Sequence, residues 1–295
     1  MPVAVLHDEF TPYGGRGGVC ATGEIIVGPG VGAPAYALDM FVVFDPVSKS
    51  ASTASVSIGG SVSSVSHGCP WGDGVAVAAY NGSANTMVVY FPDHTYDVMA
   101  APPSFTGIAG DWSTSSDGSS LLFVRSDSTT SPHLFTPGVG WTVGPGTSLR
   151  VVTQPQMFGG VMYGMSHAGD LVSINMSSGA ITVVHSSVGV PASSTSRQAV
   201  VLGGRLWFST SSTNLRGVRV SDGDVVDITV PSHSPGRLTT DGTHLFTIST
   251  GAAVYQIHPI TFNVVVHTIL TSLVAVYSMF FSGGKVWVPG SHPIS

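Results

Sequence analysis

A hairpin of one design recurs along this chain, and its spacing restricts the fold more than any other feature. In its clearest form, Val201–Thr210 contains one apolar run, the dipeptide Gly203-Gly204 and a second apolar run. Two-residue turns between strands need positive φ angles, which glycine adopts readily, so this pattern predicts a β-hairpin. Hairpins of the same design, with Gly-Gly, Asp-Gly or related turns, occur at 21–27, 71–77, 116–123, 158–163, 240–246 and 282–287.

The second turn residue of each hairpin measures the repeat. These residues are Gly23, Gly74, Gly118, Gly160, Gly204, Gly242 and Gly284. Their spacings of 51, 44, 42, 44, 38 and 42 residues define seven units. Periods of roughly 40–50 residues with several strands per unit are typical of β-propellers.

Each unit except the last continues with a second pair of apolar runs. For example, Leu171–Asn175 leads through a Ser-Ser-Gly turn to Ala180–Val184. No segment has helical periodicity of useful length. The sequence therefore predicts an all-β fold, a seven-bladed β-propeller of four-stranded antiparallel blades that occupies residues 1–295 as a single domain.

The two ends of the chain are expected to complete the ring. The seventh unit contains only two expected strands, at 275–281 and 285–289, before the chain ends. The apolar strand Pro2–Leu6 has no unit of its own. We expect residues 1–8 to pair with the seventh blade, because closure removes exposed sheet edges.

The composition narrows the classes of function. Only 9% of residues are charged and the net charge is −6, which argues against a nucleic-acid partner. No apolar run is long enough for a membrane span, and the N-terminus lacks the pattern of a secretion signal. Such a composition without an export signal fits a virion component released by lysis, or a mature extracellular fragment. Cys20 and Cys69 are expected to be free thiols.

Few motifs for chemistry are present. Gly28–Ala33 matches G-x-G-x-x-A, but Pro34 and a strand follow in place of the required helix, so no cofactor is expected. The eleven histidines lack the spacings typical of metal ligands, and no metal site is expected. Asn81-Gly-Ser and Asn175-Met-Ser match the glycosylation acceptor pattern, which is silent without export.

Superposing the units gives one candidate binding site. Seven residues before each turn glycine, most positions are polar or tyrosine. In a propeller they would form a ring at one mouth of the central channel. With two neighbours, the predicted ligand-binding residues are Arg16, His67, Asp111, Trp112, Arg197, Arg237 and Tyr277. They could bind a small anion or a sugar, or they could be solvated loop residues.

Two resemblances follow from these features. The Gly-Gly or Asp-Gly hairpins and the Asp-Pro or Asp-Gly second turns resemble seven-bladed propellers of the kelch, NHL and YVTN kind. The low charge, the richness in Ser, Thr, Gly, Val and Ala, and the scarcity of lysine resemble minor tail proteins of tailed phages that infect actinobacteria. The second resemblance implies a tail-tip role in host recognition.

Three classes of function are weighed. The first is a structural or adhesive virion protein, located in the tail, with other tail proteins and a host envelope glycan as partners. The second is an extracellular carbohydrate-binding propeller, in which Trp71, Trp112, Trp141 and Tyr163 could stack on sugar rings. The third is a lyase or glycosidase, which Asp111 alone supports weakly because glycosidases need two carboxylates. A non-enzymatic function is favoured, without catalytic residues.

Overall fold

The computed structural model of the protein describes eleven segments of the chain, which together contain 29 β-strands. No helix occurs in these segments, so none that could span a membrane is found there. The chain divides within strand β11 into two compact units, 1–114 with 272–295, and 115–271. The described residues are 3–6, 16–29, 39–101, 104–105, 112–129, 131–192, 198–231, 233–249, 253–268, 275–276 and 278–291.

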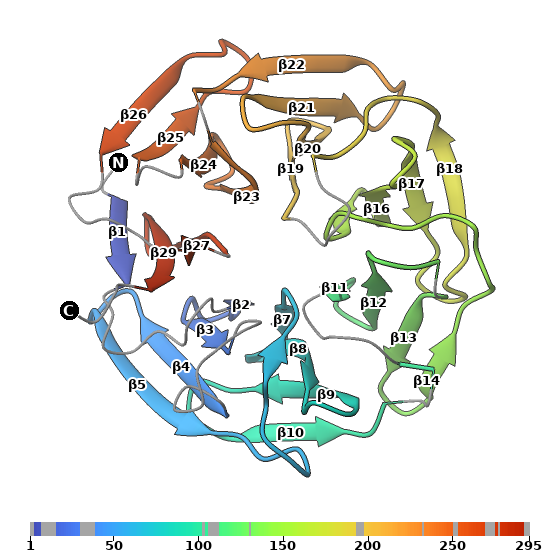
Figure 1. Ribbon diagram of the computed structural model, residues 1–295, viewed down its shortest axis with the longest axis vertical. Helices are drawn as coiled ribbons and strands as arrows, with labels where there is room; N and C mark the ends of the chain where they lie inside the picture. Colours follow the sequence, from blue (N-terminus) through green and yellow to red (C-terminus); the bar gives the residue numbers. More distant parts are fainter. Residues whose placement is uncertain are drawn as a thin grey trace. The chain divides into compact units, whose positions relative to one another are not determined.

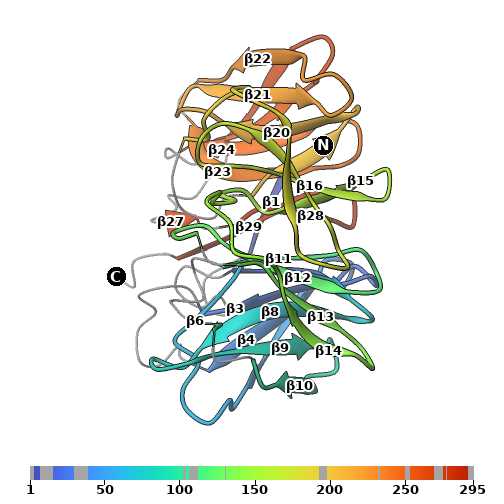
Figure 2. The same ribbon diagram turned by 90° about the vertical axis from the view of Figure 1, so that its right-hand side faces the viewer.

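Two antiparallel blades and one mixed sheet form the first unit. The first blade has the order β2-β3-β4-β5, and the second has the order β10-β9-β8-β6 with β7 also paired to β8. Figure 2 shows β8, β9 and β10 following one another in the second blade. The strands are β2 (Arg16–Val19), β3 (Ile25–Gly28), β4 (Met40–Asp45), β5 (Ser50–Ser55), β6 (Ser64–Val65), β7 (Cys69–Trp71), β8 (Gly74–Tyr80), β9 (Asn85–Tyr90) and β10 (Tyr96–Met99).

The second blade corrects one predicted turn. Trp71 pairs with Gly74, so the turn consists of Gly72 and Asp73, and Gly74 is the first residue of β8. Gly72 has φ of 54°, whereas Gly74 is not in the positive-φ region. Gly74 serves close packing instead, because a Cβ there would lie 2.5 Å from the Tyr90 carbonyl oxygen.

The mixed sheet joins the two ends of the chain. Strand β1 (Val3–Leu6) runs parallel to β29 (Lys285–Ser291), as Figure 1 shows. On its other side β29 pairs antiparallel with β27 (Ala275–Val276) and then with β28 (Phe280–Ser282). Because β27 and β28 follow one another along β29, the sheet is three strands wide.

The expected pairing of the N-terminal strand with the last unit is confirmed, but the expected number of seven four-stranded antiparallel blades is wrong. Six blades of the antiparallel kind occur in the described residues. The last unit provides only the strand positions of β27/β28 and β29, and its third strand comes from the N-terminus in parallel orientation.

Four antiparallel blades form the second unit, each in sequential strand order. The innermost strand of the first of these, β11, begins at the end of the first unit. The strands are β11 (Trp112–Ser116), β12 (Leu121–Arg125), β13 (His133–Thr136), β14 (Gly140–Val143), β15 (Gln156–Phe158), β16 (Val161–Met165), β17 (Leu171–Ile174), β18 (Ile181–His185), β19 (Val200–Leu202), β20 (Arg205–Ser209), β21 (Asn214–Arg219), β22 (Val225–Thr229), β23 (His233–Thr240), β24 (Leu245–Ser249), β25 (Ala253–Ile257) and β26 (Val264–Thr268).

The Gly-Gly hairpins form as predicted. Leu202 pairs with Arg205 around Gly203 and Gly204, whose φ angles are 60° and 74°. Positive φ at both turn residues is the geometry of a type I′ turn. Three residues after the second glycine, the Trp207 indole N–H donates to the Leu202 carbonyl at 3.0 Å. Trp287 makes the same bond to Ser282, so the indole ties the two strands of each hairpin together.

Hydrophobic clusters lie between consecutive sheets within each unit. In the first unit Phe41 of the first blade stacks on Tyr90 of the second, with ring centroids 4.7 Å apart. Phe44 meets Trp287 of the mixed sheet edge-on at 4.4 Å. In the second unit Trp207 and Leu215 share a cluster with Leu238 and Leu245 of the next blade. The blades are therefore stacked face to face, which explains the unbroken apolar runs, and the chain is an all-β propeller.

Two buried histidines in the second unit predict a loss of stability in acid. His233 is 1% exposed, and its Nε2 lies 3.1 Å from the Ser209 hydroxyl. Burial lowers the pKa of His233 to about 4 and also lowers the pKa of His133. The folded protein therefore resists protonation that the unfolded chain accepts below pH 6.5 or so. The free energy of unfolding is therefore highest above pH 6.5 or so, where His233 is neutral in both states. It decreases as the pH falls toward 4, because protons then bind to the unfolded chain in preference to the folded protein.

We expect the free energy of unfolding to fall by about 2 kcal/mol for His233 alone between pH 7.5 and pH 5. Urea unfolding at both pH values measures this difference. The His233→Gln variant, which cannot be protonated, should lose less stability over the same range. An equal loss in the variant and the wild type would show that other groups cause the acid sensitivity.

Candidate functional site

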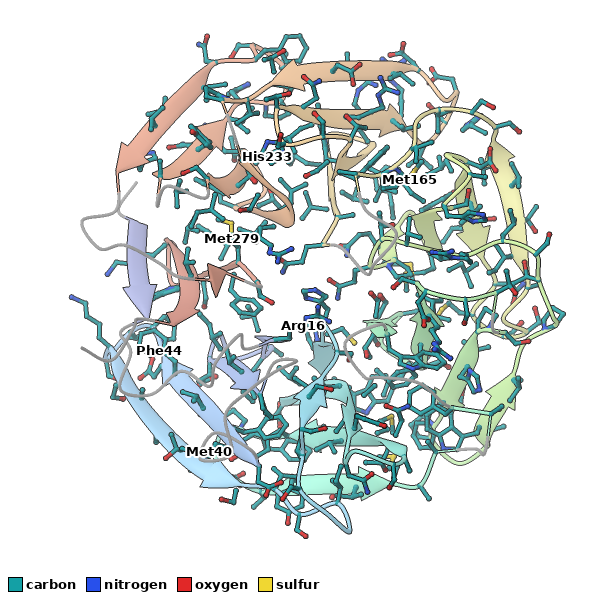
Figure 3. The ribbon with its side chains drawn as sticks, in the orientation of Figure 1. Arg16, Met40, Phe44, Met165, His233 and Met279 are labelled. Atoms are coloured by element: carbon teal, nitrogen blue, oxygen red, sulfur yellow. The ribbon has the colours of Figure 1, made fainter. Side chains whose placement is uncertain are left out.

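The structure describes four of the seven predicted ligand-binding residues. Arg16 begins β2, His67 precedes β7 and Trp112 begins β11, all in the first unit. Figure 3 shows Arg16 on the first strand of its blade, away from Phe44 on β4. The fourth, Arg237, lies in β23 of the second unit, where its carbonyl accepts a hydrogen bond from Thr247 at 2.7 Å. Asp111, Arg197 and Tyr277 lie outside the described residues.

Arg16 and His67 belong to neighbouring segments of the first and second blades. The Gly68 amide donates to the Gly17 carbonyl at 2.9 Å, which joins the two segments directly after these residues. The His67 backbone forms a parallel bridge to Ser113, and its carbonyl accepts from the Thr114 amide at 3.0 Å. The segments that contain Arg16 and His67 therefore lie side by side in the first unit.

The side chains of His67 and Trp112 serve packing. His67 is 2% exposed, and its Nδ1 lies 3.5 Å from the hydroxyl of Ser278, which is also buried. Trp112 is fully buried, and its ring lies 4.2 Å from that of Phe105. Neither side chain offers the surface that a sugar ring needs for stacking.

A pocket of about 410 Å³ lies elsewhere in the first unit, where three turns of the first and second blades meet. We call it the turn pocket. The β2–β3 turn supplies Thr22 and Glu24, the β7–β8 turn supplies Asp73, and the β9–β10 turn supplies Phe91, Pro92, Asp93 and Thr95.

The β9–β10 turn is held in place by backbone and side-chain hydrogen bonds. The Phe91 amide donates to the Thr95 carbonyl at 3.0 Å, and His94 has φ of 70°. The His94 ring lies 3.2 Å from the Tyr90 hydroxyl and 2.9 Å from the hydroxyl of Ser52 on the first blade. His94 thus fixes the turn of one blade against the neighbouring blade, and with it the wall of the pocket.

Glycine allows Phe91 to lie over the neighbouring turn. A Cβ on Gly74 would lie 2.9 Å from Phe91 Cδ1, which is too close for an ordinary side chain. The half-buried Phe91 ring and Pro92 give the turn pocket an apolar surface beside its polar groups.

Three carboxylates give the turn pocket a negative charge. Within the described residues, Glu24, Asp73 and Asp93 take part in no ion pair. Hydrogen bonds from the Thr95 hydroxyl and amide, at 2.6 and 2.9 Å, lower the pKa of Asp93. Burial, and then the charges of Glu24 and Asp73, raise the pKa of the nearby Cys20 thiol to about 12. Both carboxylates therefore act on the same region.

The carboxylates of the turn pocket do not form a metal-binding cluster with other described residues. No group of three or more metal-ligating side chains with suitable spacing occurs among the residues that the structure describes. Cys20 and Cys69 are buried free thiols, as expected. Three carboxylates beside an apolar ring suit a ligand that carries positive or hydroxyl groups.

The sequence pattern did not predict the turn pocket. Glu24 and Asp73 lie at the turns of equivalent hairpins, and Glu24 is one of only two glutamates in the chain. The equivalent positions of Glu24 and Asp73 in the repeat are the one sequence feature that could have indicated this pocket. The contribution of the β9–β10 turn has no such signal, because it depends on how two blades pack.

Comparisons with known proteins concern the fold. No family model matches the chain, and no curated protein matches it. Virginiamycin B lyase from Staphylococcus aureus is similar in structure, with a TM-score of 0.66 and 13% identity over 96% of this chain and 93% of the lyase. BamB from Moraxella catarrhalis is also similar in structure, with a TM-score of 0.54 and 13% sequence identity over 92% of this chain and 80% of BamB.

The computationally designed Ika8 protein gives a TM-score of 0.55 with 8% identity over 95% of each chain. These neighbours include a lyase and a designed protein, so they share a fold without sharing one activity, and the similarity does not indicate an activity for this chain. At such identities the comparisons establish that the chain shares their fold, and nothing about its substrate or ligand.

Proposed function

We propose that the protein is a non-catalytic binding module that recognises a surface polymer through the turn pocket. The observation that carries this proposal is the set of three carboxylates, Glu24, Asp73 and Asp93, beside the Phe91 ring. The preferred ligand is a hydroxyl-rich glycan with free amino groups. Its ammonium groups would pair with the carboxylates, and its sugar rings would pack on Phe91.

The charge state of the turn pocket supports binding in preference to acid catalysis. A glycosidase needs one carboxyl group whose pKa is raised so that it can donate a proton. Asp93 has a lowered pKa, and its Oδ1 already accepts two hydrogen bonds from Thr95. A carboxylate whose pKa is lowered stays ionised at neutral pH, which suits the recognition of a cation.

The setting of this function is proposed from composition. A chain in which only 9% of residues are charged fits the tail of a phage, where the protein would contact other tail proteins and a host envelope glycan. An extracellular carbohydrate-binding module is the alternative setting. Mass spectrometry of purified virions would detect a few copies per particle in the first case and none in the second.

Removing two charges from the turn pocket should weaken binding of an amino glycan. We expect Glu24→Gln combined with Asp73→Asn to raise the dissociation constant for glucosamine oligomers by about tenfold or more, equivalent to at least about 1.4 kcal/mol. Isothermal titration at low salt measures the change. Binding by the wild type should weaken at high salt, because solvent-exposed ion pairs are screened.

Matched controls separate this site from general charge effects. Asp97 is an exposed carboxylate on β10 outside the turn pocket, so Asp97→Asn should leave the dissociation constant unchanged. Fully N-acetylated oligomers should bind more weakly than the free amines. Equal binding by wild type and the double variant would exclude the turn pocket, and cleavage of the oligomers during titration would favour the enzymatic alternative.

A further inference from the structure

The turn between β8 and β9 presents an Asn-Gly sequence to solvent. Tyr80 pairs with Asn85, which leaves residues 81–84 as the turn. The Asn81 amide donates to the Ala84 carbonyl at 3.1 Å, and the Tyr80 hydroxyl donates to the Gly82 carbonyl at 2.8 Å. Gly82 and Ser83 are exposed. The turn is thus well formed and open to water.

Three donors surround the side-chain carbonyl of Asn81. Its Oδ1 accepts from the Ser83 amide at 3.0 Å, the Ser83 hydroxyl at 2.9 Å and the Ala84 amide at 2.8 Å. Donors on a carbonyl oxygen stabilise the negative charge that develops when a nucleophile adds to the carbon. The Asn81 carboxamide is therefore activated toward addition.

The next backbone nitrogen is an unhindered nucleophile. Gly82 has φ of 90°, and among the described residues other than 81–83 no atom lies within 4 Å of the position that a Cβ would occupy. Within the described part of the chain, its N–H donates no hydrogen bond. Gly82 therefore combines an accessible amide with the conformational freedom that ring closure requires.

We propose that Asn81 is a site of spontaneous deamidation in the folded protein. The Gly82 nitrogen attacks Asn81 Cγ and loses its proton, and the carboxamide nitrogen leaves as ammonia, which gives a five-membered succinimide. Water then opens the ring at either carbonyl. The products are aspartate, or isoaspartate with the backbone running through the former side chain.

The chain contains its own matched control. Asn175, in the β17–β18 turn, has the same arrangement, because its Oδ1 accepts from the Ser177 amide at 2.8 Å, the Ser177 hydroxyl at 2.7 Å and the Ser178 amide at 3.0 Å. The next residue is Met176, which is packed against a hydrophobic cluster and, unlike glycine, carries a side chain that restricts approach of its amide to the carboxamide. Activation of the carbonyl is equal at the two sites, and access of the nucleophile differs.

Deamidation would change the first unit locally. The Asn81 side chain packs beside Gly60, where a Cβ would lie 3.4 Å from its Nδ2. Aspartate adds a negative charge at this contact and keeps the accepting oxygen. Isoaspartate lengthens the backbone within the turn, which displaces the hydrogen bonds that the Asn81 carbonyl oxygen Oδ1 accepts.

The test incubates the purified full chain in ¹⁸O-water at pH 8 and pH 5, followed by peptide mass spectrometry. We expect the Asn81 peptide to gain heavy oxygen and to become a substrate of isoaspartate methyltransferase, and this conversion should be faster at pH 8 than at pH 5. The Asn175 peptide should convert at about one tenth of the Asn81 rate or more slowly still. Equal rates at Asn81 and Asn175 would overturn the proposal. So would conversion of Asn81 only after unfolding in urea.

Two variants test the mechanism. Ser83→Ala removes one donor to Oδ1 and should slow conversion several-fold without changing the backbone. Gly82→Ala should slow it further, and circular dichroism checks that the variant remains folded, because φ of 90° is strained for alanine. An unchanged rate in Ser83→Ala would remove the activating role of the three donors, and an unchanged rate in a folded Gly82→Ala would contradict attack by an unhindered amide.

Discussion

Deletion of residues 1–8 is expected to lower the melting temperature by about 10 °C. Strand β1 contributes four paired positions along β29, between Val3 and Val286 at one end and Leu6 and Pro289 at the other. Each lost backbone hydrogen bond costs about 1 kcal/mol, so the pairing is worth about 3–4 kcal/mol. Calorimetry or circular dichroism melting measures the shift.

The same deletion should also promote association. Without β1, the buried residues Val286, Trp287 and Val288 belong to an edge strand whose backbone groups are open to another chain. Light scattering during heating would detect this. Removal of residues 1–2 alone keeps β1 and should leave the melt unchanged. A full-length variant with Val3–Leu6 replaced by Gly and Ser separates strand pairing from chain length, and a wild-type melt for that variant would contradict the role of β1.

Trp207→Ala is expected to cost about 4 kcal/mol of stability, which lowers the melting temperature by about 10 °C. The Trp207 side chain is fully buried, and a Cβ on Gly217 would lie 2.7 Å from its Cη2, so the ring fills the space over that glycine. Alanine leaves a cavity and also removes the N–H donor to the Leu202 carbonyl. Urea unfolding measures the loss.

Trp207→Phe separates the two contributions. Phenylalanine retains most of the apolar volume and lacks the N–H group, so we expect a smaller loss of about 1–2 kcal/mol. Lys285→Ala, at a half-buried position on a comparable hairpin, should change stability little. If Trp207→Ala lost less stability than Trp207→Phe, packing over Gly217 would not be the source of the effect.

Local backbone requirements were predictable from the sequence. Gly203 and Gly204 form a two-residue turn because positive φ at both positions restricts the residue type, and their paired neighbours follow in register. At Gly72-Asp73-Gly74 the same reasoning chose the wrong glycine. Either glycine could occupy the turn, and the pairing of Trp71 with Gly74 decides between them.

Positions that depend on packing between blades were predicted less well. Superposing the repeats predicted that Arg16 and His67 lie at one level of the channel, and the structure joins their segments through the bond between Gly68 and Gly17. It could not show that Trp112 is buried against Phe105, because burial depends on a segment outside the repeat. The β9–β10 wall of the turn pocket was missed because its position beside Glu24 and Asp73 depends on how two blades pack against each other.

The sequence alone determined that this chain is built from repeated antiparallel hairpins and that its first strand pairs with its last unit. These properties follow from turn glycines and apolar runs, which act within a few residues of themselves. Only the tertiary structure decided that the last sheet is mixed and three strands wide, and that Glu24, Asp73 and Asp93 line one pocket. The three carboxylates lie on turns up to 69 residues apart, and their proximity comes from the face-to-face packing of two blades, which no local pattern records.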